Sequence, residues 1–181
     1  MSRIRAAARR RPLRQRLAVI AADPLDALDG AGGWVFDQSL AGWDVSVHVL
    51  DVGDPRPWRI MGSDVYDLRG SLDRRGHHPW PQALAISAAL LDSHEQIRTE
   101  ALAAIESGRC EMRVLGAAES IGTSNRLEPG RHRLSLAAQA FKRRAFAAAH
   151  MNSETVGGVE AFLGSSRIPF AAAAELVSLG N

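Results

Sequence analysis

The chain of 181 residues contains a single cysteine, Cys110, and a single lysine, Lys142. One cysteine cannot form an internal disulfide or a cysteine-based zinc site, so the fold has to be stabilised by an apolar core. No apolar run approaches the roughly 18 residues that a membrane-spanning helix needs. We therefore expect one globular domain without membrane contacts. The scarcity of cysteine fits a cytoplasmic location.

Arginine supplies nearly all of the positive charge, since Lys142 is the only lysine among the 22 basic residues. Many of these arginines lie before residue 17, and the first acidic residue is Asp23. Such a segment can release counterions from a polyanion without a fixed fold. We interpret residues 1–16 as a flexible basic arm, which is either a solvated tail or a contact for nucleic acid or another polyanion. The arginines expected to make that contact are Arg9, Arg10, Arg11, Arg14 and Arg16.

Residues 17–51 carry the clearest structural pattern. The run Leu17–Ala22 is continuously apolar, which is typical of a strand covered on both faces. Valines at alternate positions from 45 to 49 indicate a second strand, and the segment between the two has helical spacing. A strand, a crossover helix and a strand predict parallel pairing. We therefore predict an α/β fold of three layers, with a mostly parallel sheet of about four or five strands and flanking helices.

The remaining elements follow from local periodicity and from turn residues. We expect the α/β core to span residues 17–116 and a helical C-terminal region to span 117–181, where it packs on the core, on a protein partner or on a second copy. The predicted elements are short strands at 58–61 and 65–68, a loop at 69–81, a helix at 82–107, a strand at 110–115, a loop at 116–130, a helix at 134–150, and short helices at 159–164 and 170–179.

The segment Glu160-Ala-Phe-Leu-Gly-Ser-Ser-Arg167 resembles the turn of bacterial helix-turn-helix domains. In that family a Ser-Arg pair opens a recognition helix, whose polar side chains reach base edges. Here alanines occupy positions 171–174 instead. We therefore interpret residues 168–179 as a helix that packs or binds a partner, and not as a reader of DNA sequence.

A cluster of glycines, Gly30-Ala31-Gly32-Gly33, follows the first predicted strand, and Asp51 follows the second. Glycines at a helix N-terminus and an acid about twenty residues further on are the parts of a dinucleotide site. The fingerprint requires its first glycine at the strand end, whereas seven residues separate Ala22 from Gly30. Two interpretations remain: close helix packing, or a ligand site formed by Asp23, Gly32, Gly33 and Asp51.

Other catalytic patterns are missing from the sequence. There is no G-x-S-x-G motif for a serine nucleophile, and Cys110 begins an apolar strand pattern that favours a buried thiol. His77 and His78 have no further ligands at a recognised metal-binding spacing. We expect no metal and no cofactor.

These observations lead to one main prediction and one alternative. The main prediction is a non-catalytic α/β binding or adaptor protein that contacts nucleic acid through its basic arm. The alternative is an enzyme or sensor that binds a small nucleotide-like ligand at the 23–33 loop and Asp51.

Overall fold

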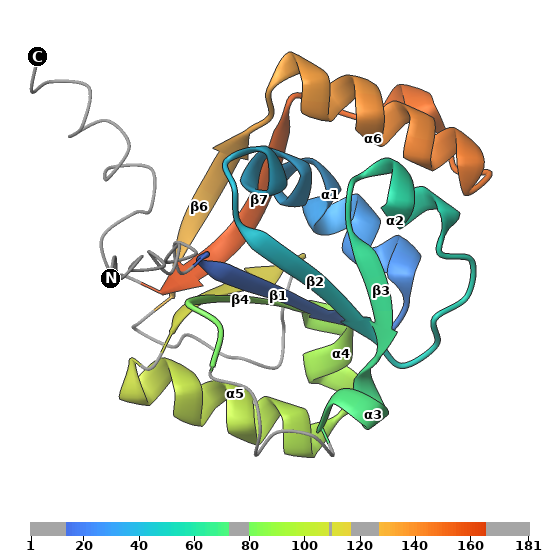
Figure 1. Ribbon diagram of the computed structural model, residues 1–181. Coiled ribbons are helices and arrows are strands. Elements are labelled where there is room, and N and C mark those ends of the chain that lie inside the picture. The colour runs from blue at the N-terminus through green and yellow to red at the C-terminus, as the bar shows by residue number, and fades with distance from the viewer. Residues whose placement is uncertain (1–13, 73–79, 109, 117–126, 166–181) are drawn as a thin grey trace, which may run out of the picture.

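The computed structural model describes residues 14–72, 80–108, 110–116 and 127–165. Within these ranges seven strands form one sheet in the order β3-β2-β1-β4-β5-β7-β6 (Figure 1). Strands β1 to β5 are parallel, whereas β7 runs antiparallel to both of its neighbours. The strands are β1 (Arg16–Ala21), β2 (Asp44–Val49), β3 (Asp64–Asp67), β4 (Ala83–Ser87), β5 (Glu111–Leu115), β6 (Leu127–Arg133) and β7 (Val159–Ser165). The α/β class is confirmed, but the sheet is larger than predicted and mixed.

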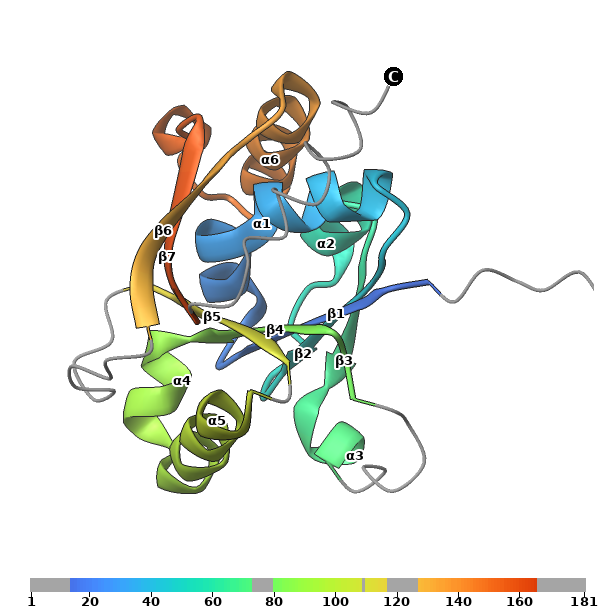
Figure 2. The same ribbon diagram turned by 90° about the vertical axis from the view of Figure 1, so that its left-hand side faces the viewer.

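Helices cover both faces of this sheet. Helices α1, α2 and α6 lie on one face, and α3, α4 and α5 lie on the other (Figure 2). One buried apolar cluster fills each interface, so the predicted three layers are present. The helices are α1 (Pro24–Leu40), α2 (Arg56–Ile60), α3 (Leu68–Leu72), α4 (Ala88–Ser93), α5 (Glu95–Ser107) and α6 (Leu136–Ala148), and a short 3₁₀ helix, η1, spans Ser153–Thr155.

The predicted helix at 82–107 is wrong in its first part. Residues 83–87 form β4, which pairs with β1 on one side and β5 on the other, and all five of its residues are buried. A short run of alanine, leucine and isoleucine suits a buried strand and a buried helix equally well, so pairing with both neighbours decides the outcome. Ser87 then ends the strand and caps α4, because its Oγ accepts a hydrogen bond from the Leu90 N–H at 3.2 Å.

The C-terminal region also differs from the prediction. The helix expected at 134–150 is confirmed as α6, but the end of the expected 116–130 loop is part of β6 and the expected helix at 159–164 is β7. The helix-turn-helix resemblance is therefore wrong over residues 160–165. The helix expected at 170–179 lies outside the described residues, and association with a partner through it stays a prediction.

The two short strands predicted at 58–61 and 65–68 have different outcomes. The strand expected at 58–61 is wrong, because this segment belongs to α2, which begins at Arg56 and Pro57. Proline suits the first turn of a helix, where its missing N–H has no intrahelical partner. The strand expected at 65–68 is confirmed as β3, with bounds one residue earlier.

Arg113 fastens the antiparallel strand β7 to the parallel part of the sheet. Its guanidinium carbon lies 4.1 Å from the centroid of the Trp34 ring on α1 and 4.2 Å from that of the Phe162 ring on β7. Burial lowers the pKa of Arg113 from its usual value, and the ion pair with Glu111 at 3.1 Å opposes that shift. Cations over aromatic faces are stabilised by the ring quadrupole, more strongly when they are desolvated.

No helix within the described ranges combines the length and the apolar composition that crossing a bilayer requires. This agrees with the absence of long apolar runs in the sequence.

The glycine cluster lies inside α1 and not in a loop. The helix runs without interruption from Pro24 to Leu40. A Cβ added at Gly33 would lie 2.4 Å from Leu134 Cδ2, and one at Gly32 would lie 2.9 Å from Leu28 Cδ1. These glycines therefore allow close packing of α1, which was the first of the two interpretations.

Replacing Gly33 with alanine should destabilise the protein although alanine favours helices. The gain in helix propensity is about 1 kcal/mol, whereas forcing the buried Leu134 to move costs about 1–3 kcal/mol. We expect a net loss of about 1 kcal/mol in the free energy of unfolding, measured by urea denaturation. In the comparison variant Gly30→Ala the new Cβ would lie 3.2 Å from Leu115 Cβ, so the loss should be smaller. A Gly33→Ala protein more stable than wild type would contradict this packing role.

His48 on β2 gives a prediction for the dependence of stability on pH. Its imidazole stacks on Tyr66 with centroids 5.5 Å apart, and burial lowers the pKa of His48 from the ordinary value of 6.5. Because the unfolded chain then binds a proton more readily than the folded one, stability should fall as the pH drops through about 6.5. Urea denaturation at about pH 7.5 and about pH 5 should show a smaller acid-induced loss for His48→Gln than for wild type. Equal losses in the two proteins would exclude this contribution.

Candidate functional site

A pocket of about 610 Å³ lies beyond the carboxyl ends of β1 and β2, where the loops after these strands meet the end of α6. Ligands of open α/β sheets bind at this edge, because the loops there are free to carry functional groups. The pocket is lined by Asp23, Pro24, Leu25, Asp26, Asp29, Asp51, Gly53, Asp54, Pro57, Ala148, Ala149, His150 and Met151.

Asp23 and Asp51, two of the residues singled out from the sequence, both line this pocket. Asp23 is the N-cap of α1, where its Oδ1 accepts hydrogen bonds from the N–H groups of Leu25 at 2.7 Å and Asp26 at 2.9 Å. Asp51 turns the loop after β2, where its Oδ1 accepts from the Gly53 N–H at 3.1 Å. Each carboxylate therefore has a local structural role and also presents negative charge to the pocket.

Gly32 and Gly33 do not belong to this site. They are buried in the middle of α1, against Leu28 and Leu134, and neither lines the pocket. The glycines therefore do not form a phosphate-binding turn at the start of the helix.

The arginines of the basic arm are described only in part. Arg9, Arg10 and Arg11 lie outside the described residues, and Arg14 is exposed just before β1. Arg16 belongs to β1, and its Nη2 donates to the Trp80 carbonyl oxygen at 3.2 Å. Contact between these side chains and a polyanion stays a prediction.

Asp26 is the most informative lining residue, and sequence reasoning missed it. Its Oδ2 atom is completely buried and has no hydrogen-bond partner in the described part of the chain. A buried carboxylate oxygen without a partner loses solvation that nothing in the protein replaces. Its position in the first turn of α1 offsets part of this cost, because the helix dipole favours negative charge there.

Asp54 differs from the other acids of the pocket because it already has a cation. The Arg56 guanidinium donates to it at 2.8 and 3.0 Å, and these hydrogen bonds lower the pKa of the Asp54 carboxyl from its usual value. Both side chains are exposed, so the pair contributes little to stability.

Trp58 joins two helices that carry lining residues of the pocket. Its ring is fully buried, and Nε1 donates to the carbonyl oxygen of Pro24 at 2.9 Å. This bond ties α2 to the first residue of α1, so Pro24 and Pro57 keep their positions along the pocket wall.

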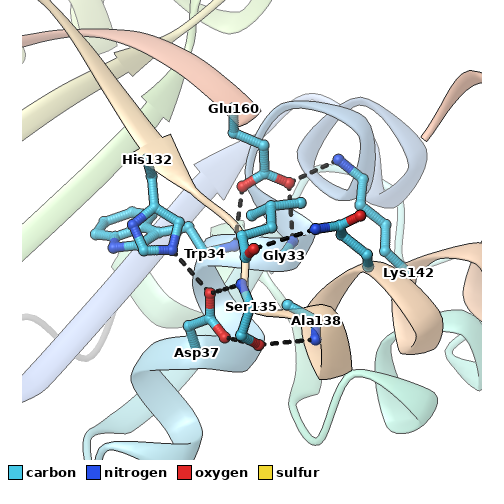
Figure 3. A network of polar contacts seen from close by, with 10 residues as sticks. Gly33, Trp34, Asp37, His132, Ser135, Ala138, Lys142 and Glu160 are labelled. Atoms are coloured by element: carbon cyan, nitrogen blue, oxygen red, sulfur yellow. Dashed lines mark hydrogen bonds and ion pairs between the residues drawn. The ribbon is translucent and has the colours of Figure 1, made fainter. Parts of the chain in front are cut away.

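A buried ion pair joins α6 to β7 beside α1 (Figure 3). Lys142 of α6 and Glu160 of β7 are 2.6 Å apart, with 5% of each side chain exposed. Lys142 Nζ also donates to the Asp29 carbonyl oxygen, and the Glu160 carboxylate accepts from the N–H groups of Gly33 and Trp34, each at 2.8 Å. In a regular helix those N–H groups would point to the carbonyls of Asp29 and Gly30, so the pair supplies partners inside the α1 ladder.

A serine, a histidine and an aspartate also meet nearby, but not as a catalytic triad. Asp37 lies between the other two: its Oδ2 is 2.9 Å from His132 Nε2, and its Oδ1 accepts from Ser135 Oγ at 2.6 Å (Figure 3). A nucleophilic serine needs the histidine as its own partner. Ser135 Oγ instead caps α6 by accepting from the Ala138 N–H at 3.0 Å, so this cluster fastens α6 to α1.

No group of three or more His, Cys, Asp or Glu side chains is arranged to hold a metal ion within the ranges that the structure describes.

No protein-family model matches the chain, and no curated protein sequence does. Solved structures do share its fold. The deacetylase Dbv21, which acts on the A40926 pseudoaglycone, superposes with a TM-score of 0.57 at 14% identity, covering 86% of this chain and 99% of its own. A deacetylase of teicoplanin biosynthesis, in complex with teicoplanin, gives a TM-score of 0.58 at 12% identity, covering 83% and 98%. The zinc-inhibited form of the teicoplanin deacetylase Orf2 gives 0.53 at 12% identity, covering 86% and 100%.

This likeness establishes the fold, and it overturns the main functional prediction. A non-catalytic adaptor is wrong as the leading interpretation, because the structures that share this fold over nearly their whole length are enzymes. Neither the amino-acid composition nor the basic arm indicated a fold shared with enzymes. The alternative, an enzyme or sensor with its ligand near Asp23 and Asp51, fits the fold better.

Removing one partner of the Lys142–Glu160 pair should be strongly destabilising. Glu160→Leu leaves a buried ammonium and two helical N–H groups without the carboxylate, so we expect a loss of about 3–5 kcal/mol in unfolding free energy. The double variant Lys142→Met/Glu160→Leu should lose less than the sum of the two single variants, because no lone charge remains. Urea denaturation of all four proteins measures the coupling.

The exposed pair Arg98–Glu95, with its atoms 3.9 Å apart, is the matched control, and breaking it should cost less than about 0.5 kcal/mol. Strict additivity of the two core substitutions would show that the pair does not act as a unit.

Proposed function

We propose that this protein is a hydrolase that removes an acetyl-type acyl group from a small hydroxyl- or amine-bearing molecule bound in the pocket at the carboxyl ends of β1 and β2. The observation that carries the proposal is the carboxylate of Asp26, a half-buried residue of the pocket lining whose Oδ2 has no hydrogen-bond partner in the described residues. The fold shared with deacetylases supports the choice of reaction.

An unpartnered carboxylate oxygen suits a general base. An ionised carboxylate only accepts hydrogen bonds. A ligand group that pairs with the Asp26 carboxylate therefore has to be a hydrogen-bond donor, such as a water molecule, an amine or a hydroxyl group. Asp26 as a residue is half-buried and lines the pocket, so water in the pocket can approach its carboxylate, be oriented for attack and pass a proton to it. Asp23 and Asp51 already accept backbone hydrogen bonds, which makes them better suited to binding the substrate than to taking its proton.

The reaction is then hydrolysis of an amide or ester. The oxygen of water bonds to the acyl carbon while one of its protons moves to the Asp26 carboxylate. The bond between that carbon and the nitrogen or oxygen of the substrate breaks, and the leaving atom takes up a proton. The products are acetate and the free amine or alcohol.

The charge of the pocket limits the part of the ligand that binds there. Five aspartates are among its lining residues, and the arginine that pairs with Asp54 lies outside the lining. Phosphate groups would be repelled, whereas carboxylates accept hydrogen bonds from sugar hydroxyls and from amines. If the ligand is nucleotide-like, as predicted from the sequence, its ribose is therefore the part that fits here.

Acetate release from a panel of N-acetylated and O-acetylated sugars tests the proposal. Wild type should release acetate, and Asp26→Asn should lower kcat/KM by about 10²–10⁴-fold, because the amide cannot take the proton. The matched control is Asp44→Asn, since Asp44 is exposed at the start of β2, on the edge of the sheet opposite the pocket. That control should keep wild-type activity.

Two results would count against the hydrolase. Equal activity in Asp26→Asn and wild type would remove Asp26 from the reaction. If the same sugars raise the melting temperature but no acetate is released, the protein binds them without hydrolysing them, as a ligand sensor would.

A further inference from the structure

We propose that His150 is the proton donor of this pocket and protonates the atom that leaves the acyl carbon. The inference rests on the hydrolase function proposed above and assigns the one proton transfer that Asp26 cannot make. The backbone conformation of His150 supports this proposal independently of the aspartates that line the pocket.

His150 is held in a conformation that side chains avoid. Its φ is +57°, and it is the one non-glycine residue with positive φ in the described part of the chain. It directly follows Ala149, the C-cap of α6. The His150 N–H donates to the Ala147 carbonyl at 3.2 Å and the Met151 N–H to the Phe146 carbonyl at 2.9 Å, which is the Schellman arrangement that usually takes glycine.

The end of α5 shows what the chain does where no side chain is needed. Gly108 ends that helix with φ +58° and ψ +31°, nearly the same φ as His150. The Cβ of an ordinary residue is crowded in this left-handed region, and glycine has none. Any side chain at this φ is uncommon, although histidine adopts it more often than most residues do, and such residues concentrate where a side chain has a function.

His150 lies where its imidazole can act on a ligand in the pocket. It lines the pocket from the α6 side, and it is the only titratable residue of the lining that is not a carboxylate. The residue is exposed, so its ring is accessible to a bound ligand. Imidazole both gives and accepts protons near neutral pH, whereas an ionised carboxylate has no proton to give.

The two proton transfers are then divided between the walls of the pocket. Asp26 on α1 receives the proton of the attacking water, and His150, which follows the C-terminus of α6, gives its proton to the leaving nitrogen or oxygen. The proton held by Asp26 afterwards returns to His150 through solvent, which restores both residues for the next cycle.

The variant His150→Gly separates a catalytic role from a structural one. Glycine relieves the backbone, so the melting temperature should rise by about 2–4 °C. Without the proton donor, kcat for acetate release should fall by about 10²-fold or more with a smaller change in KM. Added imidazole should restore part of the activity of His150→Gly, because it supplies the missing proton donor. His150→Asn, which tolerates this φ, should be equally impaired.

The control His94→Ala changes a histidine at the start of α5, on the other side of the sheet, and should keep wild-type activity. Wild-type kcat in a stabilised His150→Gly protein would overturn the assignment of His150 and leave the hydrolase proposal standing. A wild-type protein that releases no acetate from any acetylated sugar would overturn both.

Discussion

The buried carboxylate of Glu160 determines how α1 is built and what packs against it. It accepts the N–H groups of Gly33 and Trp34 and pairs with Lys142, so a strand, a helix and a second helix meet at one desolvated point. Such a pair is favourable only when hydrogen bonds satisfy its remaining atoms, as the α1 backbone does here. The glycines belong to the same arrangement, because only a residue without a side chain lets Leu134 approach the helix at this level.

The pocket is a consequence of that junction. Its acidic wall is the first part of α1, and its other wall is the end of α6; Lys142 links the two by bonding to the carbonyl of Asp29, a residue that itself lines the pocket. The pocket lies at the carboxyl edge of the parallel strands, where open α/β sheets bind their ligands. The likeness in fold leaves the chemistry of the site to its own residues.

Sequence reasoning succeeded where local pattern and final environment agree. Alternating valines predicted β2, and three- and four-residue spacing predicted α6. It failed at β4, whose apolar run does not distinguish strand from helix, and at β7, whose partners β5 and β6 are remote in the chain. Asp23 and Asp51 could be placed at the sheet edge by their position after strands. The orphaned oxygen of Asp26 and the φ of His150 leave no trace in sequence spacing.

The burial of Lys142 has a further consequence for chemical modification. Acetylation, biotinylation and ubiquitin-type conjugation require an accessible side-chain amine, and this chain has one lysine, which is only 4% exposed. Its ammonium is held by Glu160 and the Asp29 carbonyl, so reagents that need the free amine cannot reach it in the folded state. Labelling of Lys142 by an amine-directed reagent would thus report unfolding of the protein.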